Sequence, residues 1–124
     1  MRAWITGGCG MIGQHLTEFL VNKGLTVLST YYRPTTDINE LHKDCIKMEC
    51  DVRDKEKVFS IVKDFKPDQI YHLAAQSYPT VSWKDPWYTI ETNVIGTLNI
   101  FEAVKSIKPD CKILNACSSA EYGF

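Results

Sequence analysis

Three glycines near the N-terminus, Gly7, Gly10 and Gly13, have the residue type and the regular spacing of a phosphate-binding turn. They follow a short apolar run, residues 3–5, and precede a helical pattern, which predicts a turn between a strand and a helix. In such a turn one glycine can adopt a positive φ, a second lets a pyrophosphate approach the backbone, and a third lets the helix pack closely on the strand. N–H groups at the start of the helix then face the phosphates. The spacing therefore favours nucleotide binding, and the alternative is a glycine turn that only connects strand to helix.

The end of the next predicted strand, residues 26–31, lacks the acidic residue that follows such glycines by about 20 positions in many dinucleotide sites. That residue would bind the adenosine ribose hydroxyls and repel a 2′-phosphate. Its position here falls at Tyr31, with Arg33 close behind and no carboxylate before Asp37. A cation without a nearby anion suits the extra phosphate of NADP, so NADP is the expected cofactor, with NAD as the other candidate. The alternative is that Arg33 is a solvated loop residue.

Asp51 and Val52 directly follow the third predicted strand, residues 46–50. A carboxylate at that position can accept a hydrogen bond from the adenine amino group while the valine packs on the ring. The alternative is that Asp51 caps the next turn, although Asp54 is the better placed cap for the helix predicted at 55–66.

Segments typical of strands and of helices alternate along the chain. The predicted strands span residues 3–5, 26–31, 46–50, 69–74 and 112–116, and the predicted helices span 14–23, 55–66 and 86–106, with a short weak helix at 40–44 and a loop that contains Pro79 and Trp83. This alternation implies right-handed crossovers and a parallel sheet with helices on both faces. We therefore predict an α/β, Rossmann-type doubly wound sheet with strand order 3-2-1-4-5. Its ligand site should lie where the order reverses, between the first and fourth strands.

Two expectations concern particular apolar side chains. Cys117 lies in what the pattern indicates to be a buried strand. On the helix at 86–106, apolar residues on or near one face are Ile90, Val94, Leu98, Phe101 and Val104.

The composition, 124 residues with 44% hydrophobic and 23% charged, is that of one ordinary globular domain. The net charge is −1 and Lys and Arg are dispersed, so neither a nucleic acid nor a membrane surface is expected as a partner. No apolar run approaches the ~20 residues of a membrane span, and the first residues lack a signal-peptide core, so a cytoplasmic location is expected. The five cysteines form no C-x-x-C pair and the three histidines share no metal-ligand spacing, which predicts reduced thiols and no metal site.

Several stretches resemble the motifs of the extended short-chain dehydrogenase/reductase family, and within it those of the nucleotide-sugar dehydratases, epimerases and reductases. The matching stretches, in the family's order, are residues 6–13, 50–54, 72–77, 93–98 and 118–123. The run 74–78, followed by Val81, Trp83 and Pro86, is most similar to the branch that acts on GDP-mannose and its 4-keto product. The resemblance implies a GDP-linked nucleotide sugar as the partner and a homo-oligomeric full-length enzyme.

By the same resemblance, the segment after the fourth strand lines the ribose and phosphate side of the cofactor, and Asn93 supports the neighbouring strand and helix. With the turns described above, the residues expected to bind the cofactor are Gly7, Gly10, Met11, Ile12, Gly13, Tyr31, Arg33, Asp51, Val52, Leu73, Ala74, Ala75 and Gln76.

The resemblance also assigns catalytic roles to the last motif. Ser118, or failing that Ser119, would hydrogen-bond the 4-hydroxyl or 4-keto oxygen of the sugar, since a hydroxyl can donate to an oxygen that gains charge as hydride moves. Glu121 would be the carboxyl group with which dehydratases eliminate water across C5 and C6. The motif is one residue shorter than the dehydratase pattern, so a 4-keto reductase or an epimerase is an alternative. A turn at Ser118 and Ser119 that only caps the strand is the non-catalytic alternative.

The family's Tyr-x-x-x-Lys pair, a general acid/base and the lysine that lowers its pKa, has no counterpart here, because no Tyr is followed four residues later by Lys. Residues 1–124 are therefore expected to form the N-terminal, NAD(P)-binding portion of an enzyme, without its C-terminal substrate domain and inactive alone. The alternatives are a stand-alone dinucleotide-binding module and an inactive remnant.

Overall fold

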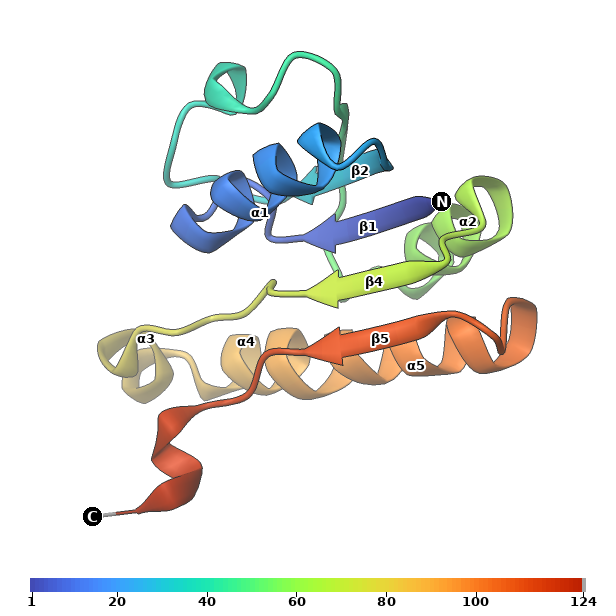
Figure 1. Cartoon of the computed structure of the whole chain (residues 1–124). Coiled ribbons are helices and arrows are strands. Elements are labelled where there is room, and N and C mark those ends of the chain that lie inside the picture. The colour runs from blue at the N-terminus through green and yellow to red at the C-terminus, as the bar shows by residue number, and fades with distance from the viewer. Residues whose placement is uncertain (124) are drawn as a thin grey trace.

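Five short parallel strands form the sheet at the centre of the molecule (Figure 1). This computed structural model describes residues 1–123, and its strand order is β3-β2-β1-β4-β5. The strands are β1 (Arg2–Thr6), β2 (Thr26–Tyr31), β3 (Ile46–Glu49), β4 (Gln69–His72) and β5 (Lys112–Asn115). Their order confirms the predicted α/β, Rossmann-type sheet. Because the strands are parallel, their carboxyl ends meet at one edge of the sheet.

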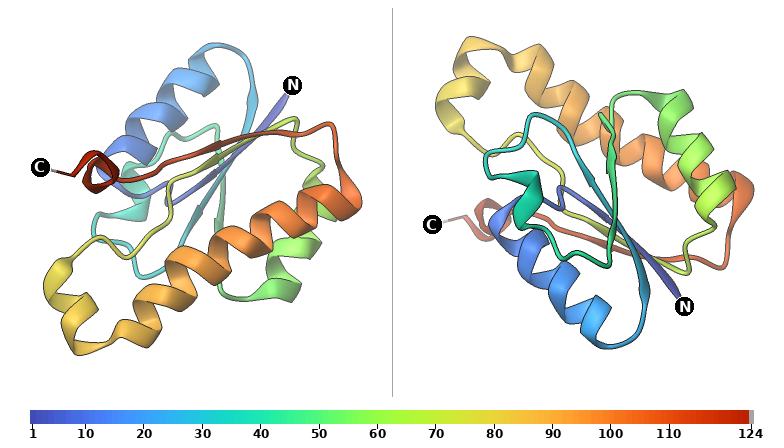
Figure 2. Two further views of the ribbon diagram at one scale, coloured as in Figure 1. Left: turned by 90° about the horizontal axis from the view of Figure 1, so that it is seen from below. Right: turned by 90° about the horizontal axis from the view of Figure 1, so that it is seen from above.

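Helices cover both faces of this sheet (Figure 2). The helical elements are α1 (Met11–Asn22), the 3-10 turn η1 (Ile38–Glu40), α2 (Lys55–Phe65), α3 (Pro79–Lys84), α4 (Pro86–Ile90), the π turn η2 (Glu91–Ile95), α5 (Gly96–Ile107) and the 3-10 turn η3 (Ser119–Tyr122). α1 packs on one face, and α2 and α5 pack against each other on the opposite face.

The buried side chains form two clusters, because successive residues of a strand point to opposite faces of the sheet. In β1, Ala3 and Ile5 belong to the cluster under α1, and Trp4 belongs to the cluster under α2 and α5. All three are fully buried. Trp4 also donates from Nε1 to Oγ1 of Thr30 at 3.0 Å, which satisfies the indole N–H. Full burial of a large apolar side chain stabilises a fold by about 1.5–3 kcal/mol.

The structure corrects two local predictions. Residues 79–84, expected in a loop, form the short helix α3, in which Pro79 occupies the first turn, where no backbone N–H is needed. The weak helix predicted at 40–44 is wrong, since the helical turn η1 lies at 38–40. Asp37 caps η1 by accepting a hydrogen bond from Asn39 N at 2.9 Å, and so begins the turn earlier than expected.

The helical segment after α3 turns a different face to the sheet from the one its apolar residues suggest. The stripe formed by Ile90, Val94, Leu98 and Phe101 is 42–53% exposed. The buried residues of η2 and α5 are mostly small or polar, and they are Thr92, Gly96, Asn99, Ile100, Ala103 and Val104. Small side chains let this helix approach the sheet and α2 closely, so the large apolar side chains lie on the outer face.

The structure also shows the environment of the cysteines and the distribution of the charges. The prediction that Cys117 lies in a buried strand is wrong, because it follows the end of β5 and is exposed. The other four cysteines are buried, and all five are free thiols.

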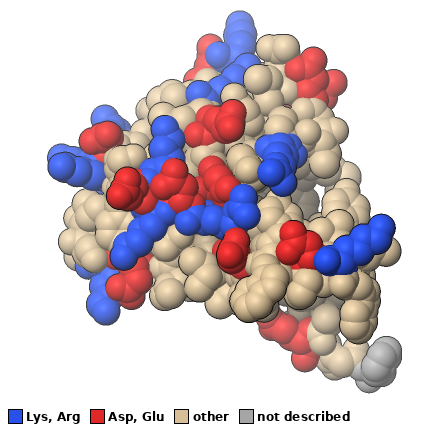
Figure 3. Space-filling view, turned by 180° about the vertical axis from the view of Figure 1, so that it is seen from behind, with Lys and Arg blue, Asp and Glu red and all other residues tan. Residues whose placement is uncertain are grey.

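On the face shown in Figure 3, Lys and Arg are interspersed with Asp and Glu. Within residues 1–123, no helix combines the length and the hydrophobicity that crossing a membrane requires.

His72, at the end of β4, is buried and hydrogen-bonded through both ring nitrogens. Thr6 Oγ1 lies 2.7 Å from Nδ1, and Thr97 Oγ1 lies 3.0 Å from Nε2. Thr6 Oγ1 already accepts from the two backbone N–H groups after His72, so its own proton is donated to Nδ1. Thr97 Oγ1 donates to Asn93 O at 2.7 Å and therefore accepts from Nε2–H. The ring is neutral, and burial lowers its pKa from 6.5 to about 4.

This histidine should make the stability of the protein pH-dependent. The unfolded chain takes up a proton on the ring near pH 6.5 and the folded chain only near pH 4, so the folded state loses stability as the pH falls between these values. The total loss should be about 3 kcal/mol. His72→Gln should flatten the profile, whereas the control His15→Gln, at an exposed position, should keep it. Urea unfolding across this pH range measures both, and an unchanged profile in His72→Gln would contradict the assignment.

Candidate functional site

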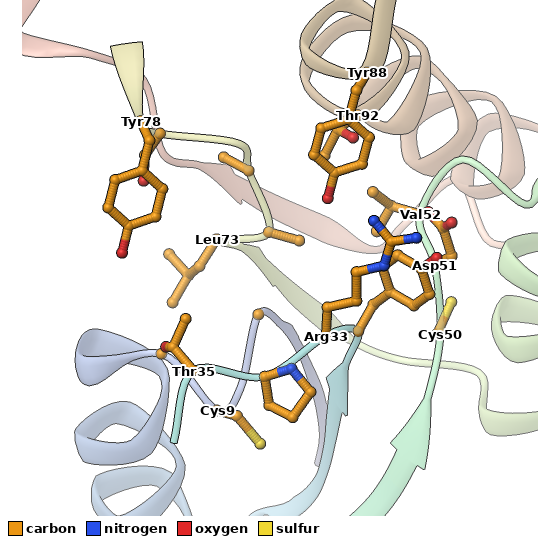
Figure 4. Close-up of a pocket in the computed structure, with 17 residues that line it drawn as sticks. Cys9, Arg33, Thr35, Cys50, Asp51, Val52, Leu73, Tyr78, Tyr88 and Thr92 are labelled. Carbon is orange, nitrogen blue, oxygen red and sulfur yellow. The ribbon is translucent and has the colours of Figure 1, made fainter. Parts of the chain in front are cut away.

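A pocket of about 260 Å³ lies at the carboxyl ends of β1 to β4 (Figure 4). This is the predicted position, where the strand order reverses. Its volume is slightly below the ~300–1,000 Å³ of typical small-molecule sites, so a ligand as long as a dinucleotide would extend out of it. Eight of the residues predicted to bind the cofactor line the pocket, and they are Gly7, Gly10, Arg33, Asp51, Val52, Leu73, Ala74 and Ala75.

The turn after β1 has the geometry that the glycine spacing predicts. Gly7 adopts a φ of 68°, which side chains disfavour. A Cβ at Gly13 would collide with the carbonyl oxygen of Gly7 and lie 2.8 Å from the Cα of Gly8. Gly13 therefore does not line the pocket but lets the helix begin close to the turn. Gly10 donates its N–H to Gly7 O at 3.0 Å and lies at the pocket surface.

Met11 and Ile12 are the first two residues of α1. Their side chains are 75% and 64% exposed and do not line the pocket. The helix makes a hydrogen bond back to the turn from Gln14 N to Gly10 O at 2.9 Å. The N–H groups of Met11, Ile12 and Gly13 have no carbonyl in a preceding helical turn, so they are available to an anion.

The loop after β2 holds an arginine between two tyrosines. Tyr31 packs against the cluster under α1 and does not line the pocket, whereas Tyr32 does. Arg33 has a φ of 48°, in the left-handed region. Its guanidinium lies 5.1 Å from the ring centroid of Tyr32 and 5.8 Å from that of Tyr88. Figure 4 shows Arg33 and Tyr88 in the pocket. Two aromatic faces thus stabilise the cation at the pocket wall.

The turn after β3 is closed by an ion pair between Asp51 and Arg53. Nη2 of Arg53 lies 2.7 Å from Oδ2, and the backbone N–H of Arg53 donates to Oδ1 at 3.0 Å. Burial raises the pKa of Asp51, but hydrogen bonds and charge from Arg53, together with the Arg33 charge, hold it below its usual 3.8. The carboxylate therefore caps its own turn, which was the alternative for Asp51. As predicted, Asp54 caps α2, accepting from Lys57 N at 3.1 Å.

The segment after β4 contributes residues 73–75, 77 and 78 to the pocket, but not Gln76. The side-chain amide of Gln76 donates to Ser82 Oγ at 3.0 Å and to Thr89 Oγ1 at 2.9 Å. Its Oε1 accepts from Tyr78 N at 2.6 Å. Gln76 therefore joins this segment to α3 and α4.

Thr92 is a pocket residue that no sequence pattern indicated. It is 8% exposed, and among residues 1–123 its Oγ1 is the one buried side-chain oxygen or nitrogen without a hydrogen-bond partner. An unsatisfied buried hydroxyl costs about 1–3 kcal/mol, so this atom marks a point at which a ligand could complete the bonding. Thr92 lies in the π turn η2, and such turns occur often at functional sites.

Two cysteines, Cys9 and Cys50, also line the pocket. Burial raises the pKa of both thiols, that of Cys50 to about 12. Both stay protonated at neutral pH and are weak nucleophiles. Across the described part of the chain, no three His, Cys, Asp or Glu side chains are grouped so that they could hold a metal ion.

The predicted catalytic residues, Ser118 and Glu121, lie beyond β5, outside the pocket, and are exposed. Ser118 caps η3, with Oγ accepting from Ala120 N at 3.1 Å. A hydroxyl that accepts keeps its own proton, so Ser118 is still able to donate to another oxygen.

Comparison with known proteins identifies relatives of the whole chain. Residues 4–124 match the family model described as GDP-mannose 4,6 dehydratase. The chain is 33% identical to a GDP-mannose 4,6-dehydratase of Yersinia enterocolitica and 32% identical to a CDP-paratose 2-epimerase of Salmonella typhi. These matches cover 98% and 99% of this chain, but only 36% and 38% of the relatives. The chain therefore spans little more than a third of their length.

A solved structure of a related enzyme also matches the chain over only part of its own length. The UDP-glucose 4-epimerase of Thermus thermophilus, in complex with NAD, is 37% identical, with a TM-score of 0.79. The superposed part covers 86% of this chain and 34% of that protein.

From the ion pair between Asp51 and Arg53 we predict how substitutions change the pKa of Asp51. Arg53→Gln should raise the pKa of Asp51, because the variant loses the guanidinium hydrogen bonds and the charge. Arg33→Gln, the matched control, should raise it less, because Arg33 acts through charge alone. NMR titration of the Asp51 carboxyl carbon measures both shifts. Equal shifts in the two variants, or none, would show that Arg53 is not the main cause.

Proposed function

Because the chain belongs to the GDP-mannose 4,6-dehydratase family of short-chain dehydrogenase/reductase-type epimerases and dehydratases, we propose that it is the NADP(H)-binding part of an enzyme that modifies a GDP-linked sugar. The observation that carries this proposal is that the glycine turn, the Arg33 loop, the Asp51 turn and the segment after β4 line one pocket. A nicotinamide dinucleotide held there would supply reversible hydride transfer. On this proposal residues 1–124 are one NAD(P)-binding domain, and the sugar-binding domain is not among them.

The pocket fits a dinucleotide in three respects. The N–H groups at the start of α1 and the bare backbone of Gly10 suit the pyrophosphate. Val52 offers an apolar surface for the adenine ring, next to the carboxylate of Asp51. Thr92 Oγ1, buried and without a partner, would find one on the bound molecule.

Gly10→Val tests whether the glycine turn binds the pyrophosphate. The φ of −73° at Gly10 suits any residue, and a Cβ there meets only the carbonyl oxygen of Gly7, at 3.3 Å, so the variant should fold. Its branched side chain should nevertheless fill the space that a pyrophosphate needs and abolish NADP(H) binding. Titration calorimetry measures binding, and far-UV circular dichroism checks the fold.

The matched control is Glu18→Val, which adds the same side chain at an exposed position of α1 and should bind as the wild type does. If Gly10→Val bound NADP(H) with wild-type affinity, the nucleotide-binding turn would be rejected.

Arg33 supports NADP as the preferred cofactor. Its cation lies at the pocket wall, held by Tyr32 and Tyr88, and the end of β2 carries no carboxylate that would repel a 2′-phosphate. NAD is the alternative, since the Thermus thermophilus relative was solved with NAD.

The preference for NADP should depend on Arg33. A charge-assisted contact to phosphate is worth about 1.5–3 kcal/mol, so NADP(H) should bind at least about tenfold more tightly than NAD(H). Arg33→Ala should lose most of this ratio, and Arg33→Lys, which keeps the charge but not the planar fork, should retain part of it. Titration calorimetry with both cofactors gives the ratios. Equal wild-type affinities for NADP(H) and NAD(H) would refute the preference.

For the reaction, we propose dehydration of GDP-mannose, with hydride transfer at C4 of the sugar. Ser118 would orient the C4 oxygen, which its free hydroxyl proton allows, and Glu121 would assist loss of water across C5 and C6. A serine hydroxyl is too weak a base to deprotonate the C4 oxygen by itself. The proposed activity therefore needs an acid/base group besides these two, and residues 1–124 alone should bind cofactor without turnover.

A nucleotide-sugar epimerase is the second candidate. The CDP-paratose 2-epimerase of Salmonella typhi matches the chain with nearly the same identity as the dehydratase of Yersinia enterocolitica. The motif at 118–123, one residue shorter than the dehydratase pattern, leaves a 4-keto reductase or an epimerase as the alternatives to a dehydratase.

A further inference from the structure

A buried asparagine on α5 holds the turn that follows β3. Asn99 is 6% exposed, and its Nδ2 donates to the carbonyl oxygens of Val52 at 2.9 Å and Arg53 at 3.3 Å. These partners lie 47 and 46 positions away in the sequence, on another element. One side-chain amide therefore links α5 to the pocket wall that Asp51 and Val52 form.

Packing fixes the same turn to the same helical segment. Val52 lies against Gly96, one helical turn before the asparagine, and a Cβ at Gly96 would be 2.6 Å from Cγ2 of Val52. Arg53 bonds the carboxylate of Asp51, and its guanidinium lies 4.9 Å from the ring centroid of Tyr88 on α4. The backbone carbonyls of the turn, the side chain of Val52 and the guanidinium of Arg53 all contact neighbouring residues. The position of the Asp51 carboxylate is therefore closely fixed.

We propose that Asn99 is a positioning residue that makes the site selective for adenine over other bases. The inference rests on the proposed function, in which Asp51 accepts from the 6-amino group and Val52 packs on the ring. Hydrogen bonds weaken steeply with misalignment, so a small displacement of this turn would remove recognition of the base. The pyrophosphate contacts belong to the turn after β1 and would persist.

The hypoxanthine analogue of NADP separates these two contributions. Hypoxanthine carries a carbonyl oxygen where adenine carries the 6-amino group, so it cannot donate to Asp51 from that position. Wild-type protein should bind NADP about tenfold more tightly than the analogue, as expected for one hydrogen bond to a charged acceptor. Asn99→Ser should bring the ratio close to 1, with little change in affinity for the analogue.

Asn93→Ser is the matched control, because it removes an amide from the same helical segment. Asn93 bonds the backbone N–H and carbonyl of Gln76, at 2.8 and 2.9 Å, and so holds the segment after β4. This variant should weaken binding of NADP and of the analogue alike and keep their ratio. A purely structural role of Asn99 would give the same result as Asn93→Ser.

The possible results distinguish failure of the inference about Asn99 from failure of the proposed function. A wild-type chain that bound neither compound would overturn both. A wild-type chain that bound both equally would overturn the contact between Asp51 and the base together with the role of Asn99, and would leave the dinucleotide site standing. An Asn99→Ser variant that kept the ratio would overturn the role of Asn99 alone. If Asn99→Ser lost its far-UV dichroism, Gly96→Ala would decide, because its methyl group displaces Val52 from the helix side and should lower the ratio. An unchanged ratio in Gly96→Ala would then overturn the inference.

Discussion

The shape of the pocket depends on hydrogen bonds from one helical segment, η2 and α5, to the ends of β3 and β4. Asn93 bonds both backbone groups of Gln76, Thr97 pairs with His72, and Asn99 holds the turn after β3. Backbone groups beyond the ends of strands have left the sheet ladder and need such partners when they are buried. Because η2 and α5 supply all three side chains, one helical segment contacts two walls of the pocket.

The π turn explains why one helical threonine differs from three others. Thr17, Thr89 and Thr97 each donate to the carbonyl oxygen four residues earlier, at 2.7, 3.3 and 2.7 Å. Thr92, inside η2, has no partner among the residues that the structure describes. A π turn widens the helix and displaces the carbonyl that a helical threonine ordinarily uses. The local departure from α-helical geometry thus leaves the hydroxyl of this pocket residue without the backbone partner that other helical threonines have.

The sheet and the glycine turn could be predicted because their causes are local. Short apolar runs mark the strands, right-handed crossovers limit the possible strand orders, and Gly7 has a conformation that glycine adopts readily. Side-chain directions could not be predicted in this way. Gln76 bonds to Thr89 on α4, and α5 buries Asn99 while Leu98 stays outside, because the facing turn presents carbonyl groups. The hydrophobic pattern of one segment does not show which residues of another segment will pack against it.

At Arg33, the proposed role in cofactor preference conflicts with the stability of the backbone. A left-handed backbone costs an ordinary L-residue about 1–2 kcal/mol, and at φ 48° this arginine carries such a penalty. Glycine would relieve the strain and would also delete the cation between the two tyrosines. A directed-evolution campaign that ranked variants only by melting temperature would therefore tend to enrich glycine at position 33. Thermostabilised forms of this protein should be selected with a cofactor in the assay, since heat resistance alone rewards loss of the pocket's charge.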